Sequence, residues 1–389
     1  MSKIRKIHLE LCSMALFSGL VDRPLFSSFM SYVKEDKLDE KMLAYSKFVS
    51  IIYSNGASLT EAAKRLIFED ENLYVKLRAK RVDVPLEISI AKDRELSVLQ
   101  EFMSLTPADF MEDMGVDFLA SYSNSLCDLS KEYEARINNI HNSGYGIFAF
   151  NPMFRLDKDG VLAPIASIDR VSVDSFIGYE SERSKVIENT LALIENRPAL
   201  NVLLYGDAGT GKSSTVKAVA NYFYDRGVRL IEIRKDQLGS LPEIMAQICD
   251  NPLKFIIFID DLSFNKNDDN FSMLKAALEG SASAKADNAV IYATSNRRHI
   301  VKESFDDRSG DDVHRNDTMQ EKLSLSERFG LVVLFEKPTK KLYLEITKEL
   351  AERNNISWDS SLEIRAEEFA LRRGNRSARC AEQFIKTLL

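Results

Sequence analysis

Residues 206–213 read Gly-Asp-Ala-Gly-Thr-Gly-Lys-Ser and follow directly after the apolar run 201–205. The pattern predicts a buried strand, a glycine-rich turn and a helix that begins near Ser214. In such a turn, backbone N–H groups point inward at a polyphosphate, Lys212 reaches its outer oxygens, and the Ser213 hydroxyl can complete the ligand shell of a magnesium ion. We therefore predict a phosphate-binding loop rather than a glycine-rich turn without a ligand.

Composition limits the class of protein. The chain has 389 residues, of which 45% are hydrophobic and 29% charged, so it can form two or three domains with a sizeable core. The net charge of −7 argues against a protein whose main surface binds nucleic acid or anionic lipid, although a local basic patch stays compatible with contact to nucleic acid. The four cysteines form no Cys-x-x-Cys pair, so we expect reduced thiols in a cytoplasmic protein.

The N-terminal stretch 7–20 follows three basic residues and superficially resembles a secretory signal. His8 and Glu10 interrupt it, and its apolar residues recur at helical spacing, which indicates an amphipathic helix. No segment reaches about 18 uninterrupted apolar residues, so we expect no membrane span.

Two kinds of sequence divide the chain. Residues 1–142 show apolar residues at helical spacing broken by turn signals, which predicts an N-terminal helical domain without a recognisable chemical motif. Its basic cluster 76–81 is either a solvated helix face or a contact to nucleic acid. Residues 143–169 form a predicted short strand-rich linker, with strands at 145–150, 154–156 and 161–165.

Residues 170–336 alternate between strand-like and helix-like segments. The strand-like runs lie at 201–205, 228–233, 255–259, 289–293 and 331–335. This alternation predicts an α/β fold, with a parallel sheet flanked by helices and ligands bound at the carboxyl ends of the strands. Residues 337–389 are helical again and predict a small C-terminal helical lid.

Polar side chains follow two of these strands. Asp260 and Asp261 end the run 255–259, at the edge where the phosphate loop also lies. Asp260 suits a magnesium ion, and Asp261 suits a residue that orients or deprotonates the attacking water. Asn296 follows the run 289–293 and can hold that water or a phosphate without adding charge. Taken singly, aspartates that end a strand and a Thr-Ser-Asn turn have ordinary structural explanations.

Three arginines are further candidates. Arg328 precedes the last strand, where it is either a surface charge or a cation that reaches the γ-phosphate bound by a neighbouring subunit. Arg376, at the start of the final helix, can reach the nucleotide from the lid. Arg379 is the alternative to Arg376, and a helix-surface charge remains open for both.

Together, these motifs resemble those of AAA+ ATPases, over roughly residues 170–389. In chain order, 176–180 is similar to the segment that packs on adenine, 206–213 to Walker A, Asp260-Asp261 to Walker B, Asn296 to sensor 1, Arg328 to the arginine finger and Arg376 to sensor 2. The resemblance implies that ATP is bound by Ile177, Gly178, Gly206, Asp207, Ala208, Gly209, Thr210, Gly211, Lys212, Ser213, Ser214 and Arg376. Within the superfamily, the stretches 205–214, 235–241, 259–264, 291–299 and 321–330 resemble an uncharacterised prokaryotic family known only as a domain of unknown function.

The resemblance implies a Mg²⁺-dependent ATPase that acts as a homo-oligomer and rearranges a macromolecular partner, with Asp261, Asn296 and Arg328 in catalytic roles and Ser213 and Asp260 at the metal. Many members have Asp-Glu in Walker B where this chain has Asp-Asp, so turnover is expected to be slow or to depend on a partner. The alternative is an ATP-dependent switch that recruits a protein partner, at DNA or elsewhere, with little turnover. A small-molecule kinase explains the phosphate loop but not the order of the other motifs.

Overall fold

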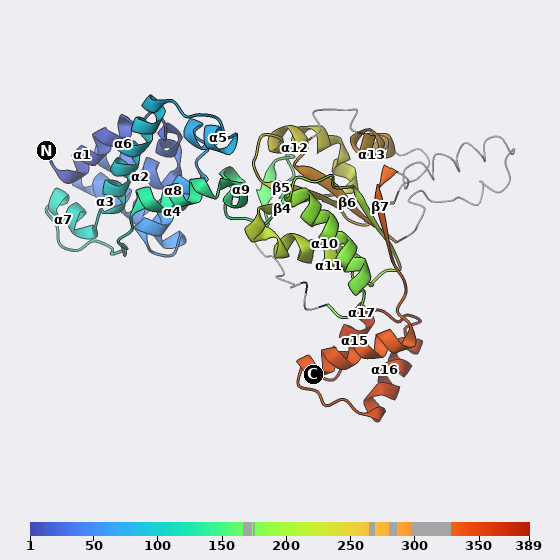
Figure 1. The fold of residues 1–389 in the computed structure, drawn as a ribbon. Coiled ribbons are helices and arrows are strands. Elements are labelled where there is room, and N and C mark those ends of the chain that lie inside the picture. The colour runs from blue at the N-terminus through green and yellow to red at the C-terminus, as the bar shows by residue number, and fades with distance from the viewer. Residues whose placement is uncertain (166–172, 174–175, 264–268, 280–285, 297–327) are drawn as a thin grey trace. The chain divides into compact units, whose positions relative to one another are not determined.

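The computed structural model describes residues 1–165, 173, 176–263, 269–279, 286–296 and 328–389 (Figure 1). Contacts between Cα atoms divide the chain into two compact units, Met1–Phe150 and Asn151–Leu389. No helix of the described residues is long and apolar enough to cross a bilayer.

The N-terminal unit is built from helices. They are α1 (Lys3–Cys12), η1 (Ser18–Asp22), α2 (Pro24–Lys34), α3 (Leu38–Ser54), α4 (Leu59–Glu69), α5 (Leu73–Ala79), α6 (Leu86–Met103), α7 (Pro107–Met114), α8 (Leu129–Asn138), α9 (Ile140–Ser143) and η2 (Gly146–Phe148). Side chains cap several of these helices at the positions that the sequence suggests. Ser58 Oγ accepts a hydrogen bond from the Glu61 N–H, and Asp109 Oδ2 accepts hydrogen bonds from the Thr106 N–H and the Thr106 hydroxyl at the start of α7.

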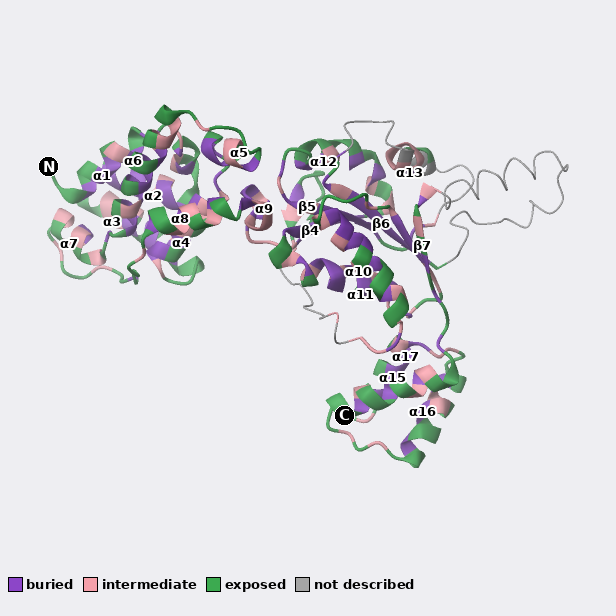
Figure 2. Ribbon diagram, in the orientation of Figure 1, coloured by how far each residue is buried: buried purple, intermediate pink, exposed green. Residues whose placement is uncertain are grey.

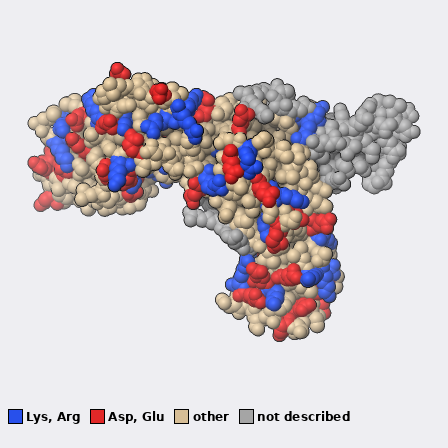
Figure 3. Space-filling model, viewed as in Figure 1, with Lys and Arg blue, Asp and Glu red and all other residues tan. Residues whose placement is uncertain are grey.

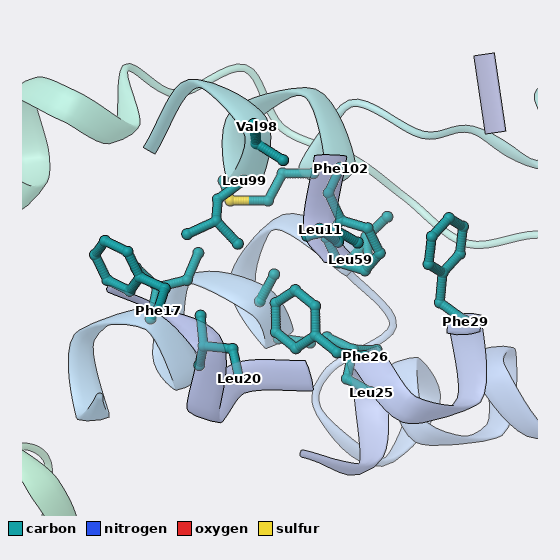
Figure 4. Close-up of a cluster of buried hydrophobic side chains, with 14 of the residues drawn as sticks. Leu11, Phe17, Leu20, Leu25, Phe26, Phe29, Leu59, Val98, Leu99 and Phe102 are labelled. Carbon is teal, nitrogen blue, oxygen red and sulfur yellow. The ribbon is translucent and has the colours of Figure 1, made fainter. Parts of the chain in front are cut away.

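Aromatic and aliphatic side chains fill the core of this unit. Figure 4 shows side chains of α1, η1, α2, α4 and α6 converging on one cluster. Phe102 stacks on Phe26 with ring centroids 4.7 Å apart and meets Phe29 edge-on at 5.2 Å. Burial of such large rings stabilises the helical unit without help from a sheet.

The second unit contains a seven-stranded sheet. Its strands are β1 (Met153–Leu156), β2 (Leu162–Pro164), β3 (Val202–Gly206), β4 (Val228–Ile233), β5 (Lys254–Ile259), β6 (Ala289–Ser295) and β7 (Leu331–Phe335), in the order β2-β1-β4-β5-β6-β3-β7. The β1–β2 pair is antiparallel and the other pairs are parallel. Residues 255–259 of the central strand β5 form a continuous apolar run because both faces of the sheet are covered there (Figure 2).

Helices cover both faces of this sheet, as the sequence predicts. The helices of the α/β part are α10 (Glu180–Ile194), α11 (Lys212–Tyr222), η4 (Tyr224–Arg226), η5 (Lys235–Ser240), α12 (Leu241–Ile248) and α13 (Asp269–Glu279). α10 and α11 pack on one face, where Val186 and Val216 share a core with the strands. α12 and α13 lie on the other side (Figure 1). The predicted α/β fold with flanking helices is confirmed.

The region between the two units differs from the sequence prediction. The predicted strand at 145–150 is wrong, because η2 (Gly146–Phe148) occupies it and both Gly144 and Gly146 have a φ of +63°, which breaks an extended chain. The strands at 154–156 and 161–165 do form as β1 and β2. They are part of the main sheet rather than a separate linker, since β1 pairs with β4.

The last three helices lie in the range 337–389, for which the sequence predicts a lid. They are α15 (Lys340–Arg353), α16 (Ser360–Arg372) and α17 (Ala378–Lys386), and they share a small core of their own. Tyr343 of α15 is fully buried in it and donates to the Ala366 carbonyl of α16. A separate core lets the lid hold its shape as one body beside the sheet.

Candidate nucleotide-binding site

The predicted phosphate-binding loop leads from β3 into α11. Three of its glycines have backbone angles that other residues rarely adopt, with φ of +140° at Gly206, +80° at Gly209 and +92° at Gly211. A Cβ atom at Gly206 would overlap the carbonyl oxygen of Phe335 on β7. The loop therefore needs glycine both for its dihedral angles and for its close approach to the neighbouring strand.

The Lys212 side chain lies inside this loop. Its Nζ donates to the carbonyl oxygens of Gly206 at 2.8 Å and Asp207 at 2.7 Å, and to Asn296 Oδ1 at 3.3 Å. Lys212 is only 6% exposed, and this burial lowers the pKa of its ammonium group, partly offset by nearby aspartates. A desolvated cation held by carbonyl dipoles favours a polyanion at this position.

Asp260 follows β5 and is hydrogen-bonded both to Ser213 at the end of the loop and to Thr294 of β6. Its Oδ1 atom accepts hydrogen bonds from Ser213 Oγ at 2.6 Å, from Thr294 Oγ1 at 2.5 Å and from the Asp261 N–H at 3.1 Å. The carboxylate of Asp260 thus lies beside the first turn of α11, as the sequence predicts for a strand that ends at the same edge of the sheet.

Asp261 and Asn296 also meet. Asp261 has a left-handed φ of +51°, and its Oδ1 accepts a 2.8 Å hydrogen bond from Asn296 Nδ2. Asn296 follows β6, and its Oδ1 faces Lys212. The amide therefore connects the loop lysine to the second aspartate.

A cavity of about 470 Å³ opens over these residues. Its lining includes Ala208, Gly209, Thr210, Gly211, Lys212, Ser213, Ser214, Asp260, Asp261, Thr294 and Asn296, together with Phe176, Ile177, Tyr179, Arg183 and Phe335, and from the lid Ile346, Leu350, Ala378, Arg379 and Glu382. Of the predicted ATP-binding residues, Gly206, Asp207, Gly178 and Arg376 are not part of this lining. The cavity has a polar end at the loop and an apolar end between Ile177 and the lid, which suits a phosphate chain joined to a flat base.

The lid presents Arg379, and not Arg376, to the cavity. Arg376 forms an ion pair with Glu367 of α16, with its Nε 3.2 Å from Glu367 Oε1. Ser377 is the N-cap of α17, so Arg376 lies before the helix and Arg379 in its first turn. Ser377 and Arg379 lie against the loop, since a Cβ atom at Gly209 would be 3.4 Å from the Arg379 Cβ atom.

Arg328 is not brought to this cavity. It precedes β7, and Leu331 pairs with Val202 at the start of β3, whereas the loop follows the other end of β3 at Gly206. The pairing places Leu331 four residues, or about 13 Å at about 3.3 Å per strand residue, before the loop end of β3. Arg328 is not among the residues that line the cavity.

The donor set at the loop fits a magnesium ion. Mg²⁺ prefers carboxylate and hydroxyl oxygens, and Ser213 Oγ and Asp260 Oδ1 lie 2.6 Å apart beside the loop. Asp260 Oδ1 accepts three hydrogen bonds, which fixes the orientation of the carboxylate. Among the residues that the structure describes, no group of three or more His, Cys, Asp and Glu side chains forms a site for another metal ion.

Two cavity residues carry interactions that the sequence did not single out. In the sequence, Thr294 is one of three small polar residues that end a predicted strand. Because Thr294 and Asn296 are two positions apart, they share a face at the end of β6, and this spacing is the signal that could have marked Thr294. Arg183 is 8% exposed, donates to the Gly178 carbonyl and lies 5.6 Å from the centre of the Phe176 ring. No sequence signal marks Arg183, because one arginine within a helical pattern is usually a surface charge.

Comparisons with known proteins give a family and distant structural neighbours. No significant match is found among curated proteins. AMPPCP-bound DnaA from Aquifex aeolicus is 18% identical over 57% of this chain and 64% of its own, with a TM-score of 0.41. The RuvB Holliday junction branch migration motor of Thermotoga maritima is 16% identical over 56% of this chain and 72% of its own, with a TM-score of 0.34.

These likenesses are too distant to carry a conclusion about this chain, which spans less than two thirds of the DnaA structure. A family model described as "Protein of unknown function (DUF815)" matches residues 149–389. This confirms the predicted similarity to an uncharacterised family. Since the match covers well over half of the sequence, the chain belongs to this family.

Proposed function

We propose that this protein is an AAA+ type ATPase that binds ATP with Mg²⁺, hydrolyses it at an interface between subunits of a homo-oligomer, and uses the cycle to remodel or assemble a macromolecular partner. One observation carries the proposal. Lys212, Ser213, Asp260, Asp261 and Asn296 come from three separate segments, yet they line one cavity and are joined by hydrogen bonds.

The geometry suggests a role for each side chain. Lys212 holds a cation where the outer phosphate oxygens of ATP would lie, and the loop N–H groups bind the phosphate chain. Ser213 and Asp260 would hold Mg²⁺, which when bound offsets the negative charge of the phosphates. Asp261 and Asn296 would orient the attacking water. Arg328, which lies away from the cavity of its own chain, would act on the nucleotide bound by a neighbouring subunit.

Steady-state ATP turnover tests this proposal. We expect Lys212→Ala and Asp261→Asn each to lower turnover by about 100-fold or more, because each removes charge placed for the transition state. Lys254→Ala is the matched control, since this half-buried lysine pairs with Asn196 away from the cavity. Turnover that is unchanged in both site variants would contradict the proposal.

A low-turnover switch is the second candidate. Asp261 is one methylene shorter than the glutamate of many AAA+ members, and its Oδ1 is already hydrogen-bonded to Asn296. Both features favour a protein that holds ATP and recruits a partner. Tight ATP binding with negligible turnover in the wild type would support this function over the first.

Nucleic acid is a less favoured partner. On the face that Figure 3 shows, acidic and basic side chains are interspersed over the described parts of the N-terminal unit and of the lid, rather than gathered into a basic stripe. If DNA is nevertheless the partner, its binding should strengthen with ATP and weaken steeply with salt, because phosphate contacts release counterions.

A further inference from the structure

Thr294 lies at the centre of the hydrogen bonds that join the two aspartates to the rest of the site. It is 2% exposed and is the sixth of seven residues in β6. Regular pairing between β5 and β6 ends at Ile259 and Ala293. Directly after Ile259 and Ala293, the Thr294 side chain makes the next hydrogen bonds between these two segments.

Both hydrogen-bonding functions of the Thr294 hydroxyl are used. Oγ1 donates to Asp260 Oδ1 at 2.5 Å and accepts from the Asp261 N–H at 2.9 Å. The Thr294 main-chain carbonyl accepts from the Leu262 N–H at 2.7 Å. A single residue therefore holds three consecutive residues after β5.

These hydrogen bonds of Thr294 explain the unusual backbone conformation of Asp261. A φ of +51° is rare for a residue other than glycine and persists only where the surroundings enforce it. With its N–H bonded to Thr294 on one side, Asp261 turns its carboxylate toward Asn296, which accepts from Lys212. The turn at Asp261 thus sets the position of the carboxylate opposite the loop.

We propose that Thr294 is a positioning residue: its hydroxyl fixes Asp260 at the magnesium position and forces Asp261 into the backbone conformation that aims its carboxylate at the attacking water. This inference rests on the proposed function. A valine at position 294 would keep the shape of the side chain but remove the hydroxyl, whereas a serine would keep the hydroxyl.

Turnover kinetics separate positioning from a general structural role. We expect Thr294→Val to lower kcat by about 100-fold, because a small misplacement of a reacting group has an effect of this size. Thr294→Ser should restore kcat nearly to that of the wild type. In an Asp261→Asn background, Thr294→Val should cause little further loss, because residues that act through one another are not additive.

Thr190→Val is the matched control. Thr190 is also a fully buried threonine of this unit, and its hydroxyl lies 2.8 Å from the Tyr292 hydroxyl, outside the cavity lining. This variant loses a buried hydroxyl but should keep kcat. An unchanged kcat in Thr294→Val, or a loss of kcat that Thr294→Ser does not restore, would overturn the inference.

A binding measurement that needs no ATP turnover tests this inference separately from the proposed hydrolysis. Binding of the non-hydrolysable analogue AMPPNP is measured in the presence of Mg²⁺ and in its absence. Thr294→Val should lose most of the gain in affinity that Mg²⁺ confers, because Asp260 loses a hydrogen bond, and Thr190→Val should keep that gain. If the wild type shows no turnover, the proposed hydrolysis fails, and this binding difference alone decides the role of Thr294: an unaltered gain in Thr294→Val rejects it.

Discussion

At the scale of single residues, two arginines of the lid differ in what they contact. Arg379 lines the cavity next to Gly209, whereas Arg376 pairs with Glu367 within the lid. We expect Arg379→Ala to raise the Kd for ATP by about tenfold, the effect of losing one charge-assisted hydrogen bond of about 1.4 kcal/mol. Arg376→Ala should lower the melting temperature and leave the Kd nearly unchanged. Equilibrium binding of a fluorescent ATP analogue measures both, and the reverse pattern would assign the nucleotide contact to Arg376.

Side chains of the phosphate loop and of the strand ends could be predicted from the sequence, because their positions follow from the strands. Asp260 comes directly after the apolar run 255–259 and Asn296 directly after the predicted strand that contains the run 289–293, and parallel strands bring their carboxyl ends to one edge. The choice between Arg376 and Arg379 could not be made in this way. It depends on Ser377 being the N-cap, which sets where the helix begins, and a shift of a few residues changes which side chain faces the cavity.

At the scale of secondary-structure elements, one buried carboxylate connects α6 to the chain after α1. Glu95 is 3% exposed, and its two carboxylate oxygens accept hydrogen bonds from the N–H groups of Ala15, Leu16 and Phe17, the shortest at 2.8 Å. These N–H groups lie between α1 and η1, where no helical bond serves them. The Glu95 carboxylate of α6 therefore holds the segment between α1 and η1 in place.

Glu95→Ala should lower the free energy of unfolding of the N-terminal unit by about 3 kcal/mol, because it leaves several buried N–H groups without an acceptor. Urea denaturation and hydrogen exchange at Leu16 and Phe17 measure the effect. Glu101→Ala, on the exposed side of the same helix, is the control and should leave both measurements nearly unchanged. Equal midpoints for the two variants would show that the Glu95 bonds contribute nothing to stability.

The elements themselves could be predicted where one physical signal dominates. β5 is a continuous apolar run because both faces of the sheet are buried. The stretch 145–150 has the same apolar character but forms η2, since the left-handed angles of Gly144 and Gly146 decide its path. The sequence could not predict that β1 pairs with β4, because a four-residue strand does not show which strand it pairs with.

At the scale of the whole molecule, the family match and the compact units divide the chain at nearly the same place. The match begins at residue 149, and the second unit is Asn151–Leu389. The proposed ATPase residues all lie in this second unit. We propose that the N-terminal helical unit, which lies almost entirely outside the family match, selects the partner.

An active site shared between subunits makes a prediction about mixtures of two inactive variants. Lys212→Ala keeps an intact Arg328, and Arg328→Ala keeps an intact Lys212. If Arg328 acts on a neighbouring subunit, an equimolar mixture should regain about a quarter of wild-type turnover, because in a ring of head-to-tail interfaces that fraction of sites combines both intact residues. The measurement is ATP turnover, with mass determined in parallel to confirm the oligomer.

A second mixture supplies the control for this prediction. Lys212→Ala and Asp261→Asn both damage the same cavity, and both keep Arg328. Every site in their mixture lacks one of the two residues, so no turnover should return. Since Arg328 is not among the residues that line the cavity of its own chain, we expect recovery only in the first mixture. Recovery in neither, with oligomers formed in both, would mean that Arg328 does not complete a neighbouring site.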